Sequence, residues 1–299
     1  MAKARAIAKR RKAVSNIKKI THTMQLIATA RYQKAYKSAV ATQPYTKKIT
    51  ELVGDLSSAG EEITHPLLSA NEGAGRTAHL VITSNRGLCG GYNASILRAA
   101  MAHEQRVVSG ESPCDLYAVG IKGISYYAFL KREITHAFRD MSDMPTFPEI
   151  EPIAADFMAR FTNGEYESIH VTYMRFHSIS RQTPETIQLL PISQKDSQDD
   201  TPAGDADQPQ ATQSAQYDFS PEPEVLLAAL LPATVKVRLF QCFTDATVSE
   251  QMARMVAMKA ATDAARDMIK MLGRSYNRAR QSQITMELLD IMGGAEAVN

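Results

Sequence analysis

The last third of the chain, residues 232–299, has no proline after Pro232 and no glycine before Gly273. Its apolar residues recur every three or four positions, which is the spacing of one face of an α-helix. A ridge with a step of four is formed by Met252, Val256, Ala260, Ala264, Met268, Leu272 and Tyr276, and it is widened by Met255, Ile269, Met271, Ala279, Met286 and Leu289. A helix over residues 233–297 would be about 95 Å long at 1.5 Å per residue. Such a helix must pack against an equally long partner or lie inside another chain.

The other end of the chain offers that partner. Residues 1–43 contain neither glycine nor proline. The three-four spacing of a coiled-coil seam is followed there by Ile7, Val14, Ile17, Thr21, Met24, Ala28 and Ala35. The chain leaves the first helix into a middle segment and enters the last helix from it. If that segment is compact, the two terminal helices run antiparallel, so the sequence predicts a long antiparallel two-helix coiled coil.

The middle segment alternates apolar runs typical of strands with amphipathic helical stretches. Strands are expected at residues 78–83, 115–119, 134–138, 168–175 and 186–192, and helices at 92–109, 122–131 and 150–161. This alternation predicts a Rossmann-like α/β sheet with helices on both faces. The domains are therefore an N-terminal coiled-coil helix at 1–60, a central α/β domain at 61–231 and a C-terminal coiled-coil helix at 232–299.

Two stretches of the middle segment are less regular. Residues 193–223 are rich in Asp, Gln, Pro, Ser and Thr, with almost nothing to bury, so a disordered or extended loop is expected. Residues 224–231 are either a short helix or the lead-in to the last one. Residues 234–240 alternate like a strand, but Pro232 suits the first position of a helix, and the downstream register also favours a helix.

Composition excludes several classes of protein. The chain is 44% hydrophobic and 22% charged, and it has no apolar run of the length that spans a membrane. Its first twenty residues are basic and lack the apolar core of a secretory signal. Cys89, Cys114 and Cys242 are widely spaced, which indicates a reduced cytosolic protein without a disulfide framework or zinc site. The seven histidines show no metal-ligand spacing, so surface or satisfied core positions are expected for them.

The first helix is strongly basic. Residues 1–50 carry thirteen Lys and Arg and no Asp or Glu. This charge attracts anionic partners, which include nucleic acid, lipid headgroups and acidic protein surfaces. The run Lys9, Arg10, Arg11 and Lys12 suits phosphate binding. A basic coiled-coil nucleic-acid-binding protein is therefore one alternative, and a solvated charged face is at least as good an explanation.

The run Arg86-Gly87-Leu88-Cys89-Gly90-Gly91 follows an expected strand and precedes an expected helix, where phosphates bind in nucleotide folds. Its glycines match neither the dinucleotide-binding fingerprint nor a P-loop. A tight turn is favoured over a nucleotide site, although a small α/β enzyme that uses this turn remains a third hypothesis. No histidine and acid are placed by the sequence to activate Cys89. No catalytic residue, metal or cofactor is predicted.

The C-terminal tip, residues 284–299, carries few charges. Apolar residues are spread around the helix at Leu288, Leu289, Ile291, Met292 and Val298, and from residue 281 onward only Glu287, Asp290 and Glu296 are charged. A helix that is apolar on all sides requires a covering surface. The tip therefore predicts a hydrophobic sleeve formed by another chain.

Residues 284–295, ITMELLDIMGGA, resemble the C-terminal signature of the gamma subunit of F-type ATP synthases. Residues 249–263, 276–281 and 84–93 and the first helix around residues 17–30 are similar to the same family. The likeness covers nearly the whole chain, in order. It departs at residues 193–223, which resemble an insertion and lack the cysteines of the regulatory dithiol in photosynthetic members.

The resemblance implies a non-catalytic rotor shaft, the central stalk, which couples proton flow through the membrane c-ring to ATP synthesis in the beta subunits. Its implied partners are the alpha and beta subunits, the epsilon subunit and the c-ring, without nucleic acid or cofactor. The implied location is the cytoplasmic face of the bacterial inner membrane, as a peripheral protein. The family pattern also implies a set of coupling contacts: Met24, Arg254, Arg280, Gln281, Thr285 and Glu287. Within this set, Arg280 and Gln281 resemble residues that hydrogen-bond a beta-subunit loop.

Overall fold

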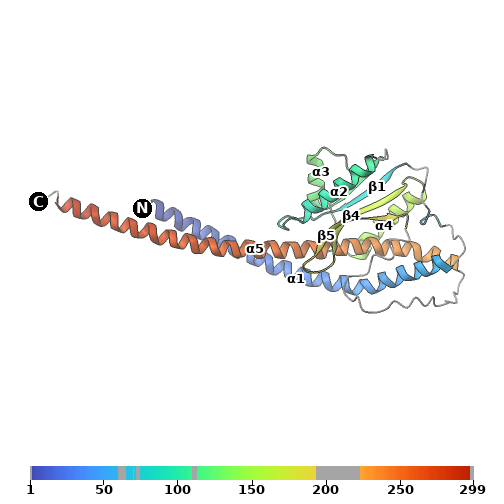
Figure 1. The fold of residues 1–299 in the computed structure, drawn as a ribbon, viewed down its shortest axis with the longest axis horizontal. Helices are drawn as coiled ribbons and strands as arrows, with labels where there is room; N and C mark the ends of the chain where they lie inside the picture. The colour runs from blue at the N-terminus through green and yellow to red at the C-terminus, as the bar shows by residue number, and fades with distance from the viewer. Residues whose placement is uncertain are drawn as a thin grey trace. The chain divides into compact units, whose positions relative to one another are not determined.

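The computed structural model describes residues 2–59, 65–69, 71, 75–109, 113–192 and 223–296, and Figure 1 shows its ribbon. The elements in chain order are α1 (Ala2–Ala59), β1 (Thr77–Ile82), α2 (Tyr92–Ser109), β2 (Cys114–Val119), α3 (Ile121–Phe129), β3 (His136–Phe138), α4 (Phe147–Thr162), β4 (Ser168–Phe176), β5 (Gln182–Leu190) and α5 (Pro223–Glu296). The chain divides into two compact units, Met1–Ala30 with Arg254–Asn299, and Arg31–Ala253. The extended loop expected at 193–223 lies outside the described residues, apart from Pro223.

The unit formed by Arg31–Ala253 is built on a five-stranded sheet of order β3-β2-β1-β4-β5. Its first four strands are parallel, with Leu80 of β1 between Tyr117 of β2 and Val171 of β4, and β5 runs antiparallel to β4. All six residues of β1 are buried. A strand covered on both faces reads as a continuous apolar run, which is why β1 could be recognised in the sequence.

Helices cover both faces of this sheet, as predicted (Figure 1). On one face, Val81 and Met174 pack with Ile96 of α2 and Tyr127 of α3. On the other face, the larger core contains Leu80, Val171, Phe157, Phe161, Leu239 and Phe243, of which the last four belong to α4 and α5. The central α/β domain is therefore confirmed, with α5 as one of its core helices.

Helix α5 begins at Pro223, so the expected helix start at Pro232 is wrong. Pro232 lies inside the helix, and residues 224–231 form its first turns. Leu231, Val235 and Leu239, spaced four apart, are all buried in the larger core. A proline interrupts the hydrogen-bonding ladder of a helix, but α5 continues through Pro232, and its buried side chains stabilise it there. Residues 234–240, which were ambiguous in the sequence, are helical, as the downstream register favoured.

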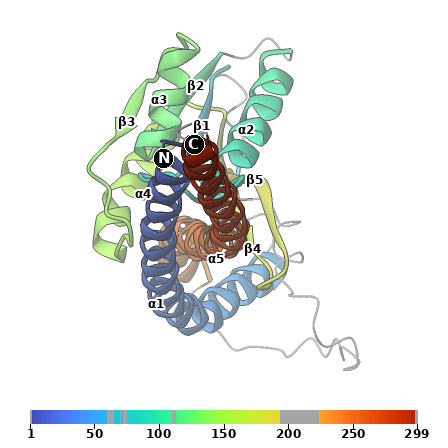
Figure 2. The ribbon, with the colours of Figure 1, turned by 90° about the vertical axis from the view of Figure 1, so that its left-hand side faces the viewer.

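The unit formed by Met1–Ala30 and Arg254–Asn299 is a helix pair. The Arg11 guanidinium lies 5.4 Å from the centroid of the Tyr276 ring, and the Thr262 hydroxyl donates a 2.8 Å hydrogen bond to the Thr21 hydroxyl. As the position in α1 increases, the matching position in α5 decreases, so the helices run antiparallel. Figures 1 and 2 show the N-terminal part of α1 lying beside the C-terminal half of α5. The predicted antiparallel pairing is confirmed.

The contact face of α5 differs from the predicted ridge. Val256, Ala260, Ala264 and Met268 are exposed. In contrast, Met258, Thr262 and Ala265 are buried, and Ile269, Leu272, Tyr276 and Ala279 are half-buried. A constant step of four rotates about 40° around the helix at each step, whereas alternating steps of three and four stay on one face. On α1, Val14 and Ala28 are buried as predicted, but Ile17 is exposed, so its assignment to the seam is wrong.

Candidate interaction surface of the paired helices

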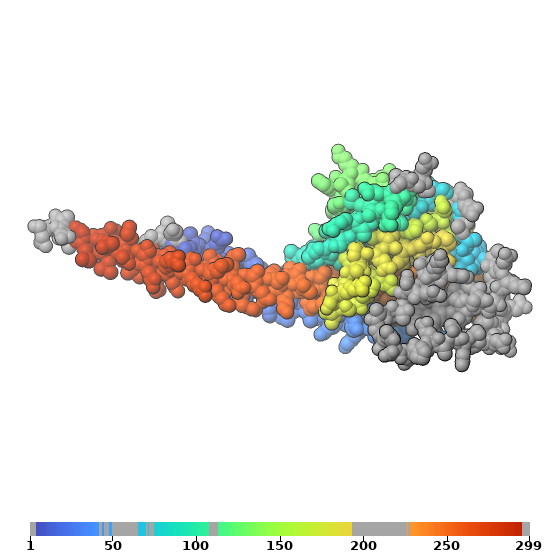
Figure 3. Space-filling model, in the orientation of Figure 1, coloured from blue at the N-terminus to red at the C-terminus, as the bar shows by residue number. Residues whose placement is uncertain are grey.

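The C-terminal part of α5 presents uncovered apolar side chains. Its large apolar residues are 49% to 70% exposed, and they are Ile284, Met286, Leu288, Leu289, Ile291 and Met292. Figures 1 and 3 show that this end of α5 extends past the N-terminal end of α1. Contiguous exposed apolar surface of this kind marks an interaction site. Val298, also assigned to the tip, lies outside the described residues.

Four of the six predicted contact residues lie close together on α5. Arg280, Gln281, Thr285 and Glu287 are all exposed. The Thr285 hydroxyl donates to the Gln281 carbonyl at 3.0 Å, and the Gln283 amide donates to the Glu287 carboxylate at 2.8 Å. These bonds hold two of the polar side chains against the helix. The guanidinium of Arg280 and the amide of Gln281 remain exposed to solvent.

The other two predicted contact residues lie elsewhere in the helix pair. Met24 is half-buried on α1, and Arg254 is buried on α5. Arg254 and Arg280 are separated by 26 positions, or about 39 Å along a helix. The contact between Thr21 and Thr262 sets the register that places Met24 near the Arg254 end of the pair. The predicted set therefore occupies two separate places.

The N-terminal part of α1 is a basic surface beside this seam. Lys9, Arg10, Lys12 and Lys19 are exposed. Arg11 turns toward α5, where the face of Tyr276 attracts its charge through a cation–π interaction. The exposed cations form a concentration of positive charge that favours an acidic partner.

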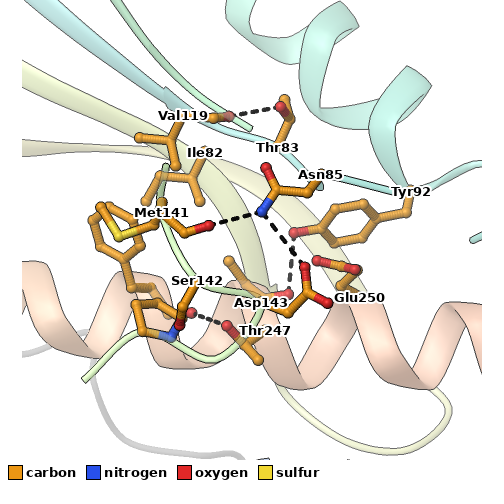
Figure 4. A pocket seen from close by; sticks show the side chains of 13 residues that line it. Ile82, Thr83, Asn85, Tyr92, Val119, Met141, Ser142, Asp143, Thr247 and Glu250 are labelled. Atoms are coloured by element: carbon orange, nitrogen blue, oxygen red, sulfur yellow. Dashed lines mark hydrogen bonds between the residues drawn. The ribbon is translucent and has the colours of Figure 1, made fainter. Parts of the chain in front are cut away.

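The glycine-rich turn between β1 and α2 was a candidate nucleotide site. The Ser84 N–H donates to Asn93 Oδ1 at 3.0 Å, and the Tyr92 hydroxyl donates to the Ala246 carbonyl of α5 at 3.0 Å. Figure 4 shows the cavity beside the turn, with Asn85 directed to the Met141 carbonyl, 2.9 Å away. This cavity measures about 30 Å³, enough for one or two water molecules. It cannot hold a nucleotide, so the turn is interpreted as structural.

Asp143, in the loop between β3 and α4, connects this turn to α1. Its carboxylate lies 3.0 Å from the Arg31 guanidinium of α1 and 3.3 Å from that of Arg86 in the turn. Tyr32, the next residue of α1, and Tyr36, one turn further along, have ring centroids 6.3 Å and 5.9 Å from that of Phe176 of β4. Burial and the neighbouring Tyr36 raise the pKa of Tyr32. Residues 31–39 of α1 are thus attached to the α/β domain by both polar and apolar contacts.

Neither a membrane-spanning helix nor a metal site occurs among the described residues. No helix in them is long and apolar enough to cross a membrane. Nor do three or more of their His, Cys, Asp and Glu side chains gather in an arrangement that could hold a metal ion.

The sequence and the fold both match known proteins. Residues 3–298 match the family model described as ATP synthase. The ATP synthase gamma chain of Rhodopirellula baltica is 44% identical over 298 residues, which cover all of this chain and 99% of the relative. That of Nocardia farcinica is 38% identical over 320 residues, with coverage of 100% and 98%. None of these matches supports the nucleic-acid-binding alternative.

Among solved structures, a chain of the Euglena gracilis mitochondrial ATP synthase, from the assembly of OSCP, F1 and c-ring, matches with a TM-score of 0.65 and 17% identity. The alignment covers 99% of this chain and 95% of that one. A chain from the rotor of the same enzyme matches with a TM-score of 0.62 and 18% identity, over 95% of this chain and 99% of that one. Both share the fold described above.

Proposed function

The chain belongs to the ATP synthase gamma-chain family, which makes it the non-catalytic rotor-stalk subunit of the complex, and we propose that its helix pair is the shaft that turns inside a ring of alpha and beta subunits. ATP chemistry takes place in the beta subunits, and the shaft changes their affinities in turn. The α/β domain forms the foot of the shaft. It contacts the epsilon subunit and the membrane c-ring, whose proton-driven rotation it transmits.

The exposed apolar end of α5 carries this proposal. A helix end with Leu288, Leu289, Ile291 and Met292 all more than half exposed is costly in water. A ring of other chains can cover these side chains on every side of the helix. A partner on one side only would leave part of the apolar surface in water, because these residues point in several directions around the helix.

The magnitude of the required work favours contacts distributed along the shaft. Inverting a population from 1:99 to 99:1 takes about 5.5 kcal/mol of differential binding. One exposed ion pair supplies about 0–1 kcal/mol. We therefore assign coupling contacts to several places, with Arg280 and Gln281 as donors to a beta-subunit loop, Thr285 and Glu287 beside them, and Met24 and Arg254 at the other place on the pair.

The basic residues of α1 have a role in the same arrangement. Lys9, Arg10 and Lys12 are exposed beside the seam, where they face acidic loops at the base of the beta subunits. Charge complementarity of this kind selects the partner and its orientation more than it adds affinity.

The subunit works at the cytoplasmic face of the bacterial inner membrane, held there through the c-ring. This placement is supported by the bacterial sources of the relatives. The assembled complex is the enzyme, and this chain alone has no predicted catalytic activity.

Copurification from the native source tests the proposal. A tagged chain is expected to recover alpha, beta and epsilon subunits. Ile291→Asp is expected to lose alpha and beta while it keeps epsilon, because the added charge lies only in the contact between the end of α5 and the ring of alpha and beta subunits. Thr77→Ser, a conservative change within β1, serves as the matched control and should recover all partners. Recovery of none of these subunits, or salt-sensitive retention on DNA instead, would overturn the proposal.

A further inference from the structure

Three histidines meet on the face of the sheet that α2 covers. His79 lies on β1, His170 on β4 and His103 on α2. The His103 ring stands between the other two, with ring centroids 4.9 Å from His79 and 4.5 Å from His170. His79 is fully buried, and the other two are partly buried. We call these three rings the histidine stack.

Only some of the ring nitrogens in the stack have a hydrogen-bond partner. His79 Nε2 lies 2.7 Å from the Thr172 hydroxyl, which in turn lies 2.6 Å from that of Thr186. His170 Nε2 lies 3.1 Å from the Ser168 hydroxyl. His79 Nδ1 and His103 Nε2 are buried and have no hydrogen-bond partner among the described residues. Buried polar atoms are rarely left in this way, which singles the stack out from an ordinary core.

One carboxylate faces the stack. Glu104 Oε1 lies 3.6 Å from His79 Nδ1, which is beyond hydrogen-bonding distance. The Tyr127 hydroxyl donates to the same oxygen at 2.9 Å, and Arg132 lies 3.7 Å from the other. Burial favours the neutral acid, but the His79 ring and the Tyr127 hydroxyl hold the pKa of Glu104 below its ordinary value. This single anion is already in contact with Tyr127 and Arg132.

The remaining neighbours add no negative charge at neutral pH. Burial and the nearby Glu104 raise the pKa of the Cys114 thiol on β2 to about 11, so this thiol stays neutral. Arg106 of α2 adds positive charge near His103. The strand β5 offers uncharged groups, Thr186 and Gln188, opposite Thr172 and His170.

This environment disfavours positive charge on His103 and His170. Burial, followed by the neighbouring His79, lowers the pKa of His103 to about 4. Burial, followed by His103 and His79, lowers the pKa of His170 to about 4. Both rings are therefore neutral at pH 7, and further protons are bound more readily when the rings separate and reach water.

We propose that the histidine stack is an acid-sensitive lock, which holds α2 against β1 and β4 while His103 and His170 are neutral and releases that helix when these two rings take up protons. The lock is a property of the α/β domain and does not depend on the rotor function.

The direction of the effect follows from linkage. Unfolding restores an ordinary histidine pKa of about 6.5, so the unfolded chain binds more protons than the folded one between about pH 6.5 and pH 4. The contribution of the lock to stability is fully present above pH 6.5 and is lost as the pH falls toward 4. Each histidine changes the unfolding equilibrium by at most about tenfold per pH unit. Because His103 and His170 are only partly buried, we expect roughly tenfold in total between pH 7.5 and pH 5.

The test compares the full-length chain with the double variant His103→Gln/His170→Gln, in urea unfolding at pH 7.5 and pH 5. The unfolding equilibrium of the natural chain is expected to shift about tenfold more than that of the double variant. Calorimetry at pH 5.5 in buffers of different ionisation enthalpy should show about one additional proton taken up when the natural chain unfolds. His136→Gln, at an exposed position of β3, is the matched control and should behave as the natural chain does. Equal pH dependence and equal proton uptake in the natural chain and the double variant would overturn the proposal.

A measurement on the natural chain covers the case in which the double variant does not fold. An NMR titration of the imidazole signals is expected to show His103 and His170 neutral down to about pH 5. A midpoint near pH 6.5 for either ring would overturn the lock.

Discussion

Helix α5 belongs to both compact units, and its surroundings differ sharply between them. In the α/β domain, residues 242–252 are all buried, whereas in the helix pair residues 284–294 are all exposed. Both stretches carry apolar side chains around the helix. In the first, the sheet, α4 and α1 of the same chain supply the covering surface. An apolar helix can therefore belong either to a core or to an interface, and which of the two it is depends on whether the same chain provides a surface that covers it.

Matched leucine truncations in α5, one in its core-facing part just before the buried stretch and one in the exposed stretch, should separate core from interface. Leu239→Ala removes a fully buried side chain from the α/β core and is expected to cost about 2–5 kcal/mol of unfolding free energy. Leu289→Ala, at an exposed position, should change it by about 0.5 kcal/mol or less, yet weaken the recovery of alpha and beta subunits. Urea unfolding of both full-length variants measures the difference. Similar losses of unfolding free energy in the two variants would contradict the assignment of one site to a core and the other to an interface.

Met24→Lys examines the interface at the other end of the helix pair. A mobile cation at this half-buried position is expected to lower proton pumping per ATP hydrolysed by roughly fivefold, while assembly is kept. Reconstituted vesicles report both rates. Thr23→Lys, at the exposed neighbouring position, is the control and should pump normally. Unchanged pumping by Met24→Lys would remove this residue from the coupling contacts.

Thr262→Val tests the seam of the helix pair, where polar contacts take the place of part of an apolar core. The change removes the 2.8 Å hydrogen bond to Thr21 and is expected to destabilise the helix pair by about 1 kcal/mol. Thr23→Val is the matched control, since the Thr23 hydroxyl bonds only to the Lys19 carbonyl of its own helix. Hydrogen exchange of residues 254–280 measures the effect. Equal exchange in both variants would show that the seam bond contributes nothing.

The smallest effect is expected for the ion pair between Arg31 and Asp143. These side chains are 37% and 23% exposed, and Arg86 also contacts the same carboxylate. A double-mutant cycle with Arg31→Ala and Asp143→Ala should give a coupling energy of about 0.5 kcal/mol, which falls as salt is added. A coupling above about 2 kcal/mol that salt does not reduce would place this pair among the core interactions instead.

Much of the fold could be predicted because its elements have distinct periods. The parallel strands read as short apolar runs, and α2 and α4 carry helical spacing between them. The start of α5 was missed because Pro232 is a strong local signal, which the burial of Leu231 and Val235 overrides. Ile17 was wrongly assigned to the seam, because a residue on the seam and a residue beside it can be separated by only one position in the sequence.

The interaction surface could be predicted in part. The apolar tip needed no tertiary information, since its composition alone requires a cover. The split of the contact set into two places depends on the register between Thr21 and Thr262, which no single helix encodes. The histidine stack was not foreseen, because His79, His103 and His170 come from three elements that only the sheet topology brings together.

Rotation is the most direct test of the central claim that the helix pair is a shaft enclosed by other chains. The complex is immobilised through its beta subunits, a probe is attached to the α/β domain of this chain, and ATP is added. The probe is expected to rotate in one direction for as long as ATP is hydrolysed. A probe that stays fixed while hydrolysis continues would show that the helix pair is not a turning shaft.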